Sequence, residues 1–80
     1  MKIPAIKLLV ENYSLSDLKQ AENDLIEGEA LKINVEGGDE GEQLTHVIAA
    51  LWIMEEMNAK NIEFKEALRE YTKKVRESIN

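Results

Sequence analysis

The 80 residues of this chain include no cysteine, one proline and one histidine. Without cysteine there is neither a disulfide framework nor a thiolate metal site, which fits a reducing compartment. The single proline, Pro4, suits the first turn of a helix, where its missing N–H group costs nothing. The apolar stretch over residues 3–10 is short and interrupted by Lys7, so it does not predict a signal peptide. We therefore expect a cytoplasmic protein.

Catalytic motifs are also scarce. No serine lies beside a histidine, and no glycine-rich phosphate loop appears. The net charge of −6 argues against nucleic acid as a general partner, because phosphate binding depends on lysine and arginine. The content of 44% hydrophobic and 32% charged residues is typical of a globular protein, and the length indicates one domain over residues 1–80. We expect no enzyme activity, no cofactor and no membrane contact.

The stretch over residues 41–57 is the segment around which we expect the rest of the chain to pack. It is rich in good helix formers, and from Val47 to Met54 it has no charged or amide side chain. One face of the predicted helix carries Leu44, Val47, Ile48, Leu51 and Met54. The opposite face carries Glu42, His46, Ala49, Ala50, Ile53 and Met57. A helix that is apolar nearly all round is buried on all sides.

The second of these faces predicts a homodimer. So short a chain has few elements to wrap such a helix, because small domains bury only about 60% of the surface that their unfolded chains expose. A second copy is the simplest cover, and the alternative is another helix of the same chain. The predicted dimer interface consists of His46, Ala49, Ala50, Ile53 and Met57.

The remaining patterns predict an all-α, four-helix bundle-like domain. Ser14 and Asp17 form a variant of the capping box before the second helix, and Gly28 suits its end. Asp39 suits the N-cap of the central helix. The last helix has apolar residues at steps of three and four, and it should pack antiparallel to the central one. The predicted helices span residues 3–12, 15–27, 41–58 and 62–79.

The segment over residues 30–36 lacks helical periodicity. Leu31, Ile33 and Val35 alternate with polar residues, which is a strand pattern. No second strand is visible, and a lone strand leaves unpaired backbone groups. The segment either pairs with its twin across a dimer axis as a short β segment or packs as an extended connector over the central helix. We favour the connector.

Two candidate metal ligands, Glu42 and His46, lie one turn apart on the central helix. Such a pair can take part in metal binding or proton transfer, but a metal site needs three or four ligands. Position 50 is alanine, so only a second copy of the pair would complete a site. We therefore predict no metal site and interpret His46 as a structural histidine, with a pH-sensitive interface as the alternative.

Charge is distributed unevenly along the chain. Residues 20–42 carry eight acids against Lys32 alone, whereas residues 58–80 carry six bases against four acids. The best candidate surface for a protein partner is the acidic face of the second helix with the loop that precedes the central helix. This surface consists of Glu22, Asp24, Glu27, Asp39 and Glu40.

The segments Gly41–Val47 and Ala67–Thr72, together with the Met-Lys-hydrophobic-Pro start, resemble a family of short bacterial helical proteins of unknown function. The resemblance covers nearly the whole chain and includes no catalytic signature. It implies a small, helical, stand-alone cytoplasmic protein.

The expected function is that of a small homodimeric protein-interaction or adaptor module. The first alternative is a small-ligand or metal-binding sensor that uses His46 and Glu42. The second alternative is a nucleic-acid-associated regulator that uses the basic last helix.

Overall fold

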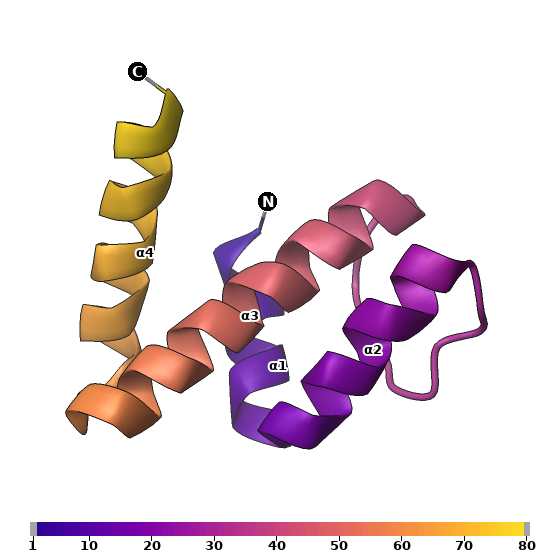
Figure 1. Cartoon of the computed structure of the whole chain (residues 1–80), viewed down its shortest axis with the longest axis horizontal. Coiled ribbons are helices and arrows are strands. Elements are labelled where there is room, and N and C mark those ends of the chain that lie inside the picture. Colours follow the sequence, from indigo (N-terminus) through magenta and orange to yellow (C-terminus); the bar gives the residue numbers. More distant parts are fainter. Residues whose placement is uncertain (1, 80) are drawn as a thin grey trace.

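The computed structural model describes residues 2–79, which form helices and the connections between them. The helices are α1 (Ile3–Asn12), α2 (Leu15–Glu27), α3 (Glu40–Lys60) and α4 (Phe64–Ile79), as Figure 1 shows. Residues 2–79 contain no strand. The predicted all-α class with four helices is confirmed, and the β segment considered for residues 30–36 is absent.

The helix ends follow the local signals in the sequence. Ser14 and Asp17 make both bonds of the capping box: each backbone N–H donates to the other side chain at 3.1 Å. Gly28 ends α2 at a φ of 74°, a left-handed conformation that glycine adopts without a steric penalty. The backbone N–H of Glu42 donates to Asp39 Oδ1 at 2.8 Å, so Asp39 caps α3 as predicted. Each such cap is worth about 1 kcal/mol.

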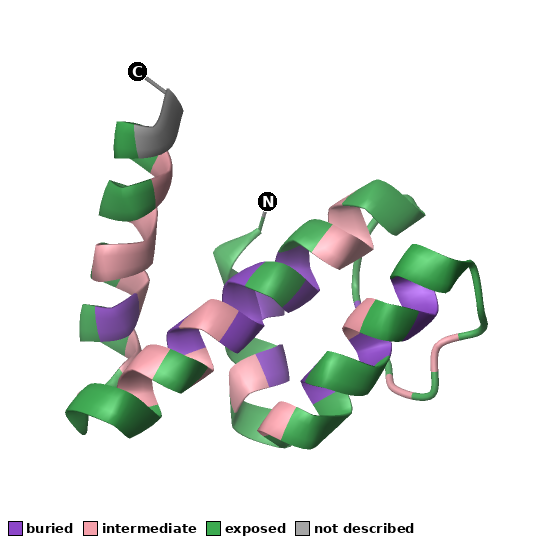
Figure 2. Cartoon of the chain, viewed as in Figure 1, coloured by how far each residue is buried: buried purple, intermediate pink, exposed green. Residues whose placement is uncertain are grey.

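Helix α3 is the element on which each of the other three helices packs. Figure 2 shows that its middle turns hold most of its buried residues. Ile53 has no exposed surface, and full burial of such a side chain contributes about 1.5–3 kcal/mol. Among the residues whose burial the structure describes, those buried in the other elements are Ala5, Ile6 and Leu9 in α1, Leu18, Ala21, Asp24 and Leu25 in α2, Val35 in the connector, and Ala67 in α4.

The face of α3 that we assigned to a dimer interface is covered by the chain itself. His46, Ala49, Ala50 and Ile53 are fully buried, and Met57 is half-buried. Helix α1 crosses behind the middle of α3 in Figure 1, and short alanine side chains let a neighbouring helix come close. The inference that 80 residues are too few to cover this face is therefore wrong. His46, Ala49, Ala50 and Ile53 therefore leave no exposed surface on which a second copy could pack.

The segment between α2 and α3 is the extended connector that we favoured. Val35 is buried, and Leu31 and Ile33 pack against the core. Side chains supply the hydrogen bonds that a partner strand would otherwise make. The backbone N–H of Asn34 donates to the Tyr13 hydroxyl at 3.2 Å, and Gln43 Nε2 donates to the carbonyl oxygen of Val35 at 2.9 Å. These bonds matter most around the buried Val35, because an unpaired buried backbone group is costly.

Helix α4 turns away from α3 at a wide angle, so its last turns stand apart from the other helices (Figure 1). The close antiparallel packing that we expected is limited to its first half, where Phe64, Ala67, Leu68 and Tyr71 join the core. Helix α3 is followed by Asn61, which adopts a left-handed backbone conformation with a φ of 55°. This conformation ends the helix and changes the direction of the chain before α4. The resulting molecule is flat, with extents of 31 × 29 × 19 Å.

Two adjacent glycines before α3, Gly37 and Gly38, differ in the space around their Cα atoms. A Cβ atom on Gly37 would lie 2.9 Å from the backbone nitrogen of Gln43, whereas one on Gly38 would meet only Glu42 Oε1 at 3.9 Å. We expect Gly37→Ala to lower the free energy of unfolding by about 1–3 kcal/mol, because the backbone has to shift. Gly38→Ala should leave it nearly unchanged. Urea unfolding followed by circular dichroism measures both, and equal stability of the two variants would contradict this packing.

Candidate functional site

His46 joins the start of the chain to the connector. Its Nδ1 lies 2.8 Å from the carbonyl oxygen of Glu36, and its Nε2 accepts the backbone N–H of Lys2 at 3.0 Å. A carbonyl oxygen is only an acceptor, so Nδ1 carries the proton and Nε2 is the acceptor of a neutral ring. The ring is fully buried and both nitrogens are used. His46 is therefore placed as a structural histidine.

Glu42 lies one turn earlier but is bonded elsewhere. Its Oε1 accepts the backbone N–H of Gly38 at 2.8 Å, and this hydrogen bond is the main reason that the pKa of Glu42 lies below its ordinary value. The carboxylate thus closes the loop before α3 and does not bond to His46. Among residues 2–79, no three His, Asp or Glu side chains are placed to hold a metal ion.

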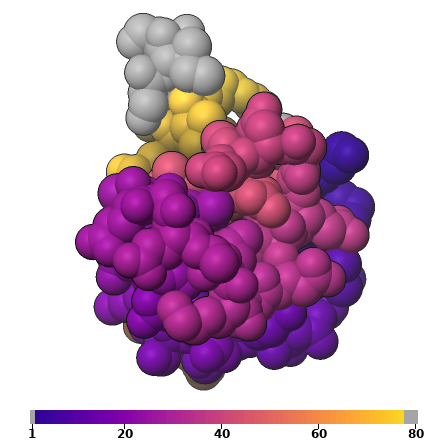
Figure 3. Space-filling view, turned by 90° about the vertical axis from the view of Figure 1, so that its right-hand side faces the viewer, coloured from indigo at the N-terminus to yellow at the C-terminus, as the bar shows by residue number. Residues whose placement is uncertain are grey.

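Not all residues of the acidic partner surface predicted from the sequence are exposed. Asp24 is buried, accepts a hydrogen bond from Gln20 Nε2 at 2.9 Å and lies 3.5 Å from Lys32 Nζ. Its inclusion in that surface is therefore wrong, because its carboxylate is used inside the fold. The other predicted members, Glu22, Glu27, Asp39 and Glu40, keep exposed surface. Figure 3 shows the end of the molecule where α2, the connector and the first turns of α3 lie together.

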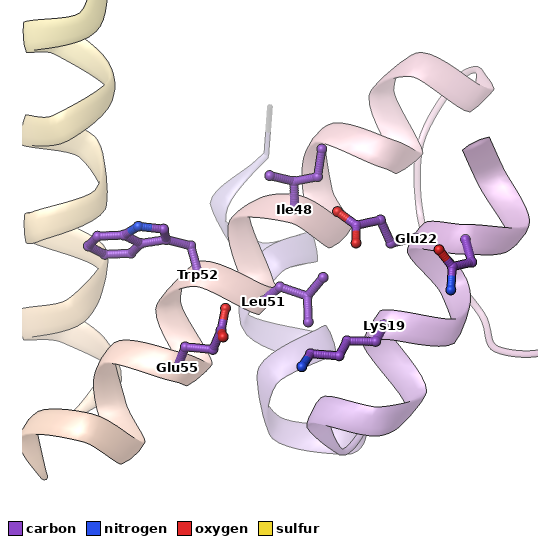
Figure 4. A pocket seen from close by; sticks show the side chains of 7 residues that line it. Lys19, Glu22, Ile48, Leu51, Trp52 and Glu55 are labelled. Atoms are coloured by element: carbon purple, nitrogen blue, oxygen red, sulfur yellow. The ribbon is translucent and has the colours of Figure 1, made fainter.

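A groove of about 320 Å³ lies between α2 and α3. Its floor is apolar and comes from Ile48, Leu51 and Trp52, which Figure 4 shows on α3. Ile48 is 42% exposed although its neighbours Val47 and Ala49 in the middle of α3 are fully buried. The polar residues that line the groove are Lys19, Glu22 and Asn23 of α2 and Glu55 of α3.

Trp52 also lines a second hollow, of about 390 Å³, in the corner between α3 and α4. Its ring meets that of Tyr71 at a centroid distance of 5.6 Å. Beside the rings, Lys60 Nζ bonds Glu56 at 2.9 Å and Glu70 at 3.1 Å, which lowers the pKa of Glu56 and raises that of Lys60. The two hollows share Trp52, so we treat them as one concave face that extends from α2 across α3 to α4.

The model of a family of unknown function, DUF6952, matches residues 1–80. The chain belongs to the DUF6952 family. This match confirms the resemblance to a family of unknown function that the sequence indicated. No curated protein matches the DUF6952 chain. No solved structure matches it either. No helix within residues 2–79 combines the length and the apolar character that crossing a membrane requires.

Sequence reasoning missed the concave face of the DUF6952 chain. It placed Ile48 and Leu51 on an apolar face of the central helix that it expected to be buried. Leu51 is buried as expected, but Ile48 is exposed and Trp52 is only half-buried. The sequence did contain a signal for this face, namely the excess of apolar residues around α3. We expected the uncovered apolar side of α3 to be the one with His46, whereas it is the side with Ile48.

The hydrogen bonds of His46 predict both its tautomer and its contribution to stability. Long-range ¹⁵N couplings of the imidazole should show the proton on Nδ1. We expect His46→Ala to cost about 2–4 kcal/mol, since it leaves a cavity and two unpaired backbone groups. His46→Gln, which keeps a donor and an acceptor, should cost less. A zinc titration by calorimetry should give no binding heat, and a strong zinc signal that His46→Ala removes would contradict the structural role.

The hydrogen bond that Gly38 donates to Glu42 predicts that the stability of the chain depends on the ionisation of the Glu42 carboxyl group. Since its pKa is lowered in the folded chain, the charged carboxylate contributes stability above its ordinary pKa of 4.5 and loses it as the pH falls through the lowered value. We expect Glu42→Gln to be less stable than the original chain at pH 7, with the difference shrinking below pH 4.5. Thermal unfolding across this range measures the difference, and a constant difference would argue against it.

Proposed function

We propose that this DUF6952 chain is a non-enzymatic protein-interaction module that binds an amphipathic helix in its concave face. The proposal rests above all on Ile48, which is 42% exposed beside Leu51 and Trp52 in a groove. Large apolar side chains that gather in a groove are typical of sites that receive the apolar stripe of a helix.

The charges around the groove favour a basic partner helix. Glu22 and Glu55 line the groove against Lys19 alone. Glu27 on α2 and Asp39 and Glu40 at the start of α3 are exposed and add further negative charge to these two elements. Opposite charges on the two sides of an interface speed association and suppress wrong partners. The partner that fits is therefore a helix with an apolar stripe flanked by lysine or arginine.

This proposal keeps the interaction class that the sequence favoured and moves the site. The partner contact is no longer a purely acidic surface, because an apolar floor now lies beside Glu22. The sensor alternative has no support from the geometry, since both ring nitrogens of His46 are bonded within the fold.

The position of Trp52 provides a direct test. It is the only tryptophan in the chain, so its fluorescence reports on the groove. A synthetic amphipathic helix with a leucine stripe and lysine flanks should shift the emission of Trp52 to the blue in a saturable way. A matched peptide with glutamate flanks should bind at least about tenfold more weakly, a difference of roughly 1.4 kcal/mol.

Two variants of similar exposure serve as the matched pair. Ile48→Glu places a charge on the groove floor and should abolish the fluorescence change. Leu8→Glu changes a residue of α1 that is 47% exposed outside the groove, and it should bind the peptide like the original chain. The proposal fails if neither peptide gives a saturable signal or if Ile48→Glu binds as tightly as Leu8→Glu.

A further inference from the structure

Helix α4 is attached to the rest of the molecule mainly through its first half. It packs on α3, and Ala67 is fully buried close to its start. The small side chain of Ala67 lets the two helices meet closely at this point. Beyond it the helices diverge, and the last turns of α4 stand apart from the other helices (Figure 1). Ala67 therefore marks a crossing point about which α4 can turn.

The backbone between the two helices allows such a turn. The backbone N–H of Ile62 donates to the carbonyl oxygen of Met57 at 3.3 Å, a bond that belongs to the end of α3. The backbone N–H of Ala67 donates to the carbonyl oxygen of Glu63 at 3.1 Å, a bond that belongs to the start of α4. A change of the dihedral angles between Ile62 and Glu63 breaks neither of these bonds.

The contacts that fix the wide angle of α4 are weak. Lys60 Nζ lies 3.1 Å from Glu70 Oε1, but both side chains are more than a third exposed, and exposed ion pairs contribute little to stability. Farther along, the rings of Trp52 and Tyr71 meet at a centroid distance of 5.6 Å. Packed helices prefer interaxial angles of about 20° or about 50°. A wide and a narrow arrangement of α3 and α4 are therefore both regular packing modes.

The contact between Trp52 and Tyr71 determines which residues meet when the angle narrows. In two antiparallel helices, one turn back along the first lies opposite one turn forward along the second. Ile48 lies four residues before Trp52, which points toward α4 in Figure 4, and Val75 lies four residues after Tyr71. Ile48 is 42% exposed, and Val75 is half-buried outside the apolar cluster. These two apolar side chains are therefore in register across the open corner.

We propose that α4 is a lid that regulates the concave face. It turns about Ala67 to a closed position, nearly antiparallel to α3, in which Val75 covers Ile48 and Tyr71 stays on Trp52. Closure fills the hollow of about 390 Å³ between α3 and α4 and withdraws Ile48 from a partner helix. It is favoured by the burial of apolar area that the open form leaves in water. The proposal rests on the interaction function proposed above and adds that α4 competes with the partner.

A pair of engineered cysteines detects the closed position, because the chain has no cysteine of its own. In the double variant Ile48→Cys/Val75→Cys, a disulfide forms only when the two Cα atoms come within about 7 Å of each other. We expect this disulfide to form within one chain under mild oxidation in dilute solution. Loss of free thiols measures its rate, and a mass that stays that of a monomer shows that it is intramolecular.

The matched control is the double variant Leu8→Cys/Val75→Cys. Leu8 is 47% exposed, close to the value of Ile48, but it lies on α1. The control pair should react at least about tenfold more slowly, because closure brings Val75 toward α3 and leaves it out of disulfide range of α1.

A single substitution measures the competition with the partner. Val75→Gln keeps the groove floor but disfavours the closed position, which would bury an amide. The apparent Kd of a partner that binds only the open form is the intrinsic Kd divided by the open fraction. In the Trp52 fluorescence titration, we expect Val75→Gln to bind the lysine-flanked peptide at least about twofold more tightly than the original chain, which is then closed at least about half of the time. Leu8→Gln should bind like the original chain.

Two results would overturn the lid. The first is an Ile48→Cys/Val75→Cys variant that forms its disulfide no faster than the control pair. The second is a Val75→Gln variant that binds the peptide as tightly as the original chain or more weakly, since weaker binding means that Val75 holds the partner. Should either occur while the original chain binds the peptide, the groove function stands and its regulation falls. Should the disulfide form while the original chain does not bind the peptide, α4 closes, but the function proposed above falls together with the competition.

Discussion

The burial of α3 around most of its circumference is the constraint on which the rest of the structure depends. A helix of this kind needs cover on every side, and the chain provides it with three helices and one extended connector. The connector is held in place because Tyr13, which follows α1, and two side chains of α3 form hydrogen bonds with its backbone. Tyr13, Gln43 and His46 each bond a different backbone group between residues 34 and 36. These bonds fix an extended segment that has no partner strand among the described residues.

His46 shows how a polar residue can belong to an apolar core. Its two ring nitrogens face one acceptor and one donor, so the neutral ring loses no hydrogen bond on burial. The same geometry removes it from ligand chemistry, because a metal or substrate would have to displace the bonds that hold the start of α1 against the connector. Glu42 is used in a comparable way, since its carboxylate stabilises the loop that leads into α3. Glu42 and His46, the candidate metal ligands, thus both stabilise the fold.

The concave face has a different origin, because it comes from the direction of α4. Asn61 turns the chain sharply, and the contacts of Trp52 with Tyr71 and of Lys60 with Glu70 hold α4 at its wide angle. Helix α4 therefore covers one end of α3 and leaves Ile48 open. The walls of the resulting face come from α2 and α4, on either side of α3.

Interactions between residues close in sequence determined the helices and their ends. At these points the structure agrees with the prediction from the sequence. The bonds of Ser14, Asp17 and Asp39 join residues three apart, and Gly28 adopts a conformation that other residues avoid. Such interactions do not depend on how the helices pack. The sequence also showed correctly that α3 is apolar on too many sides for a simple surface helix. Which of those sides remains open was decided only by the tertiary structure. The open side depends on the path of the connector, on the hydrogen bonds of His46 and on the angle of α4. These features rest on contacts between residues as distant in sequence as Lys2 and His46.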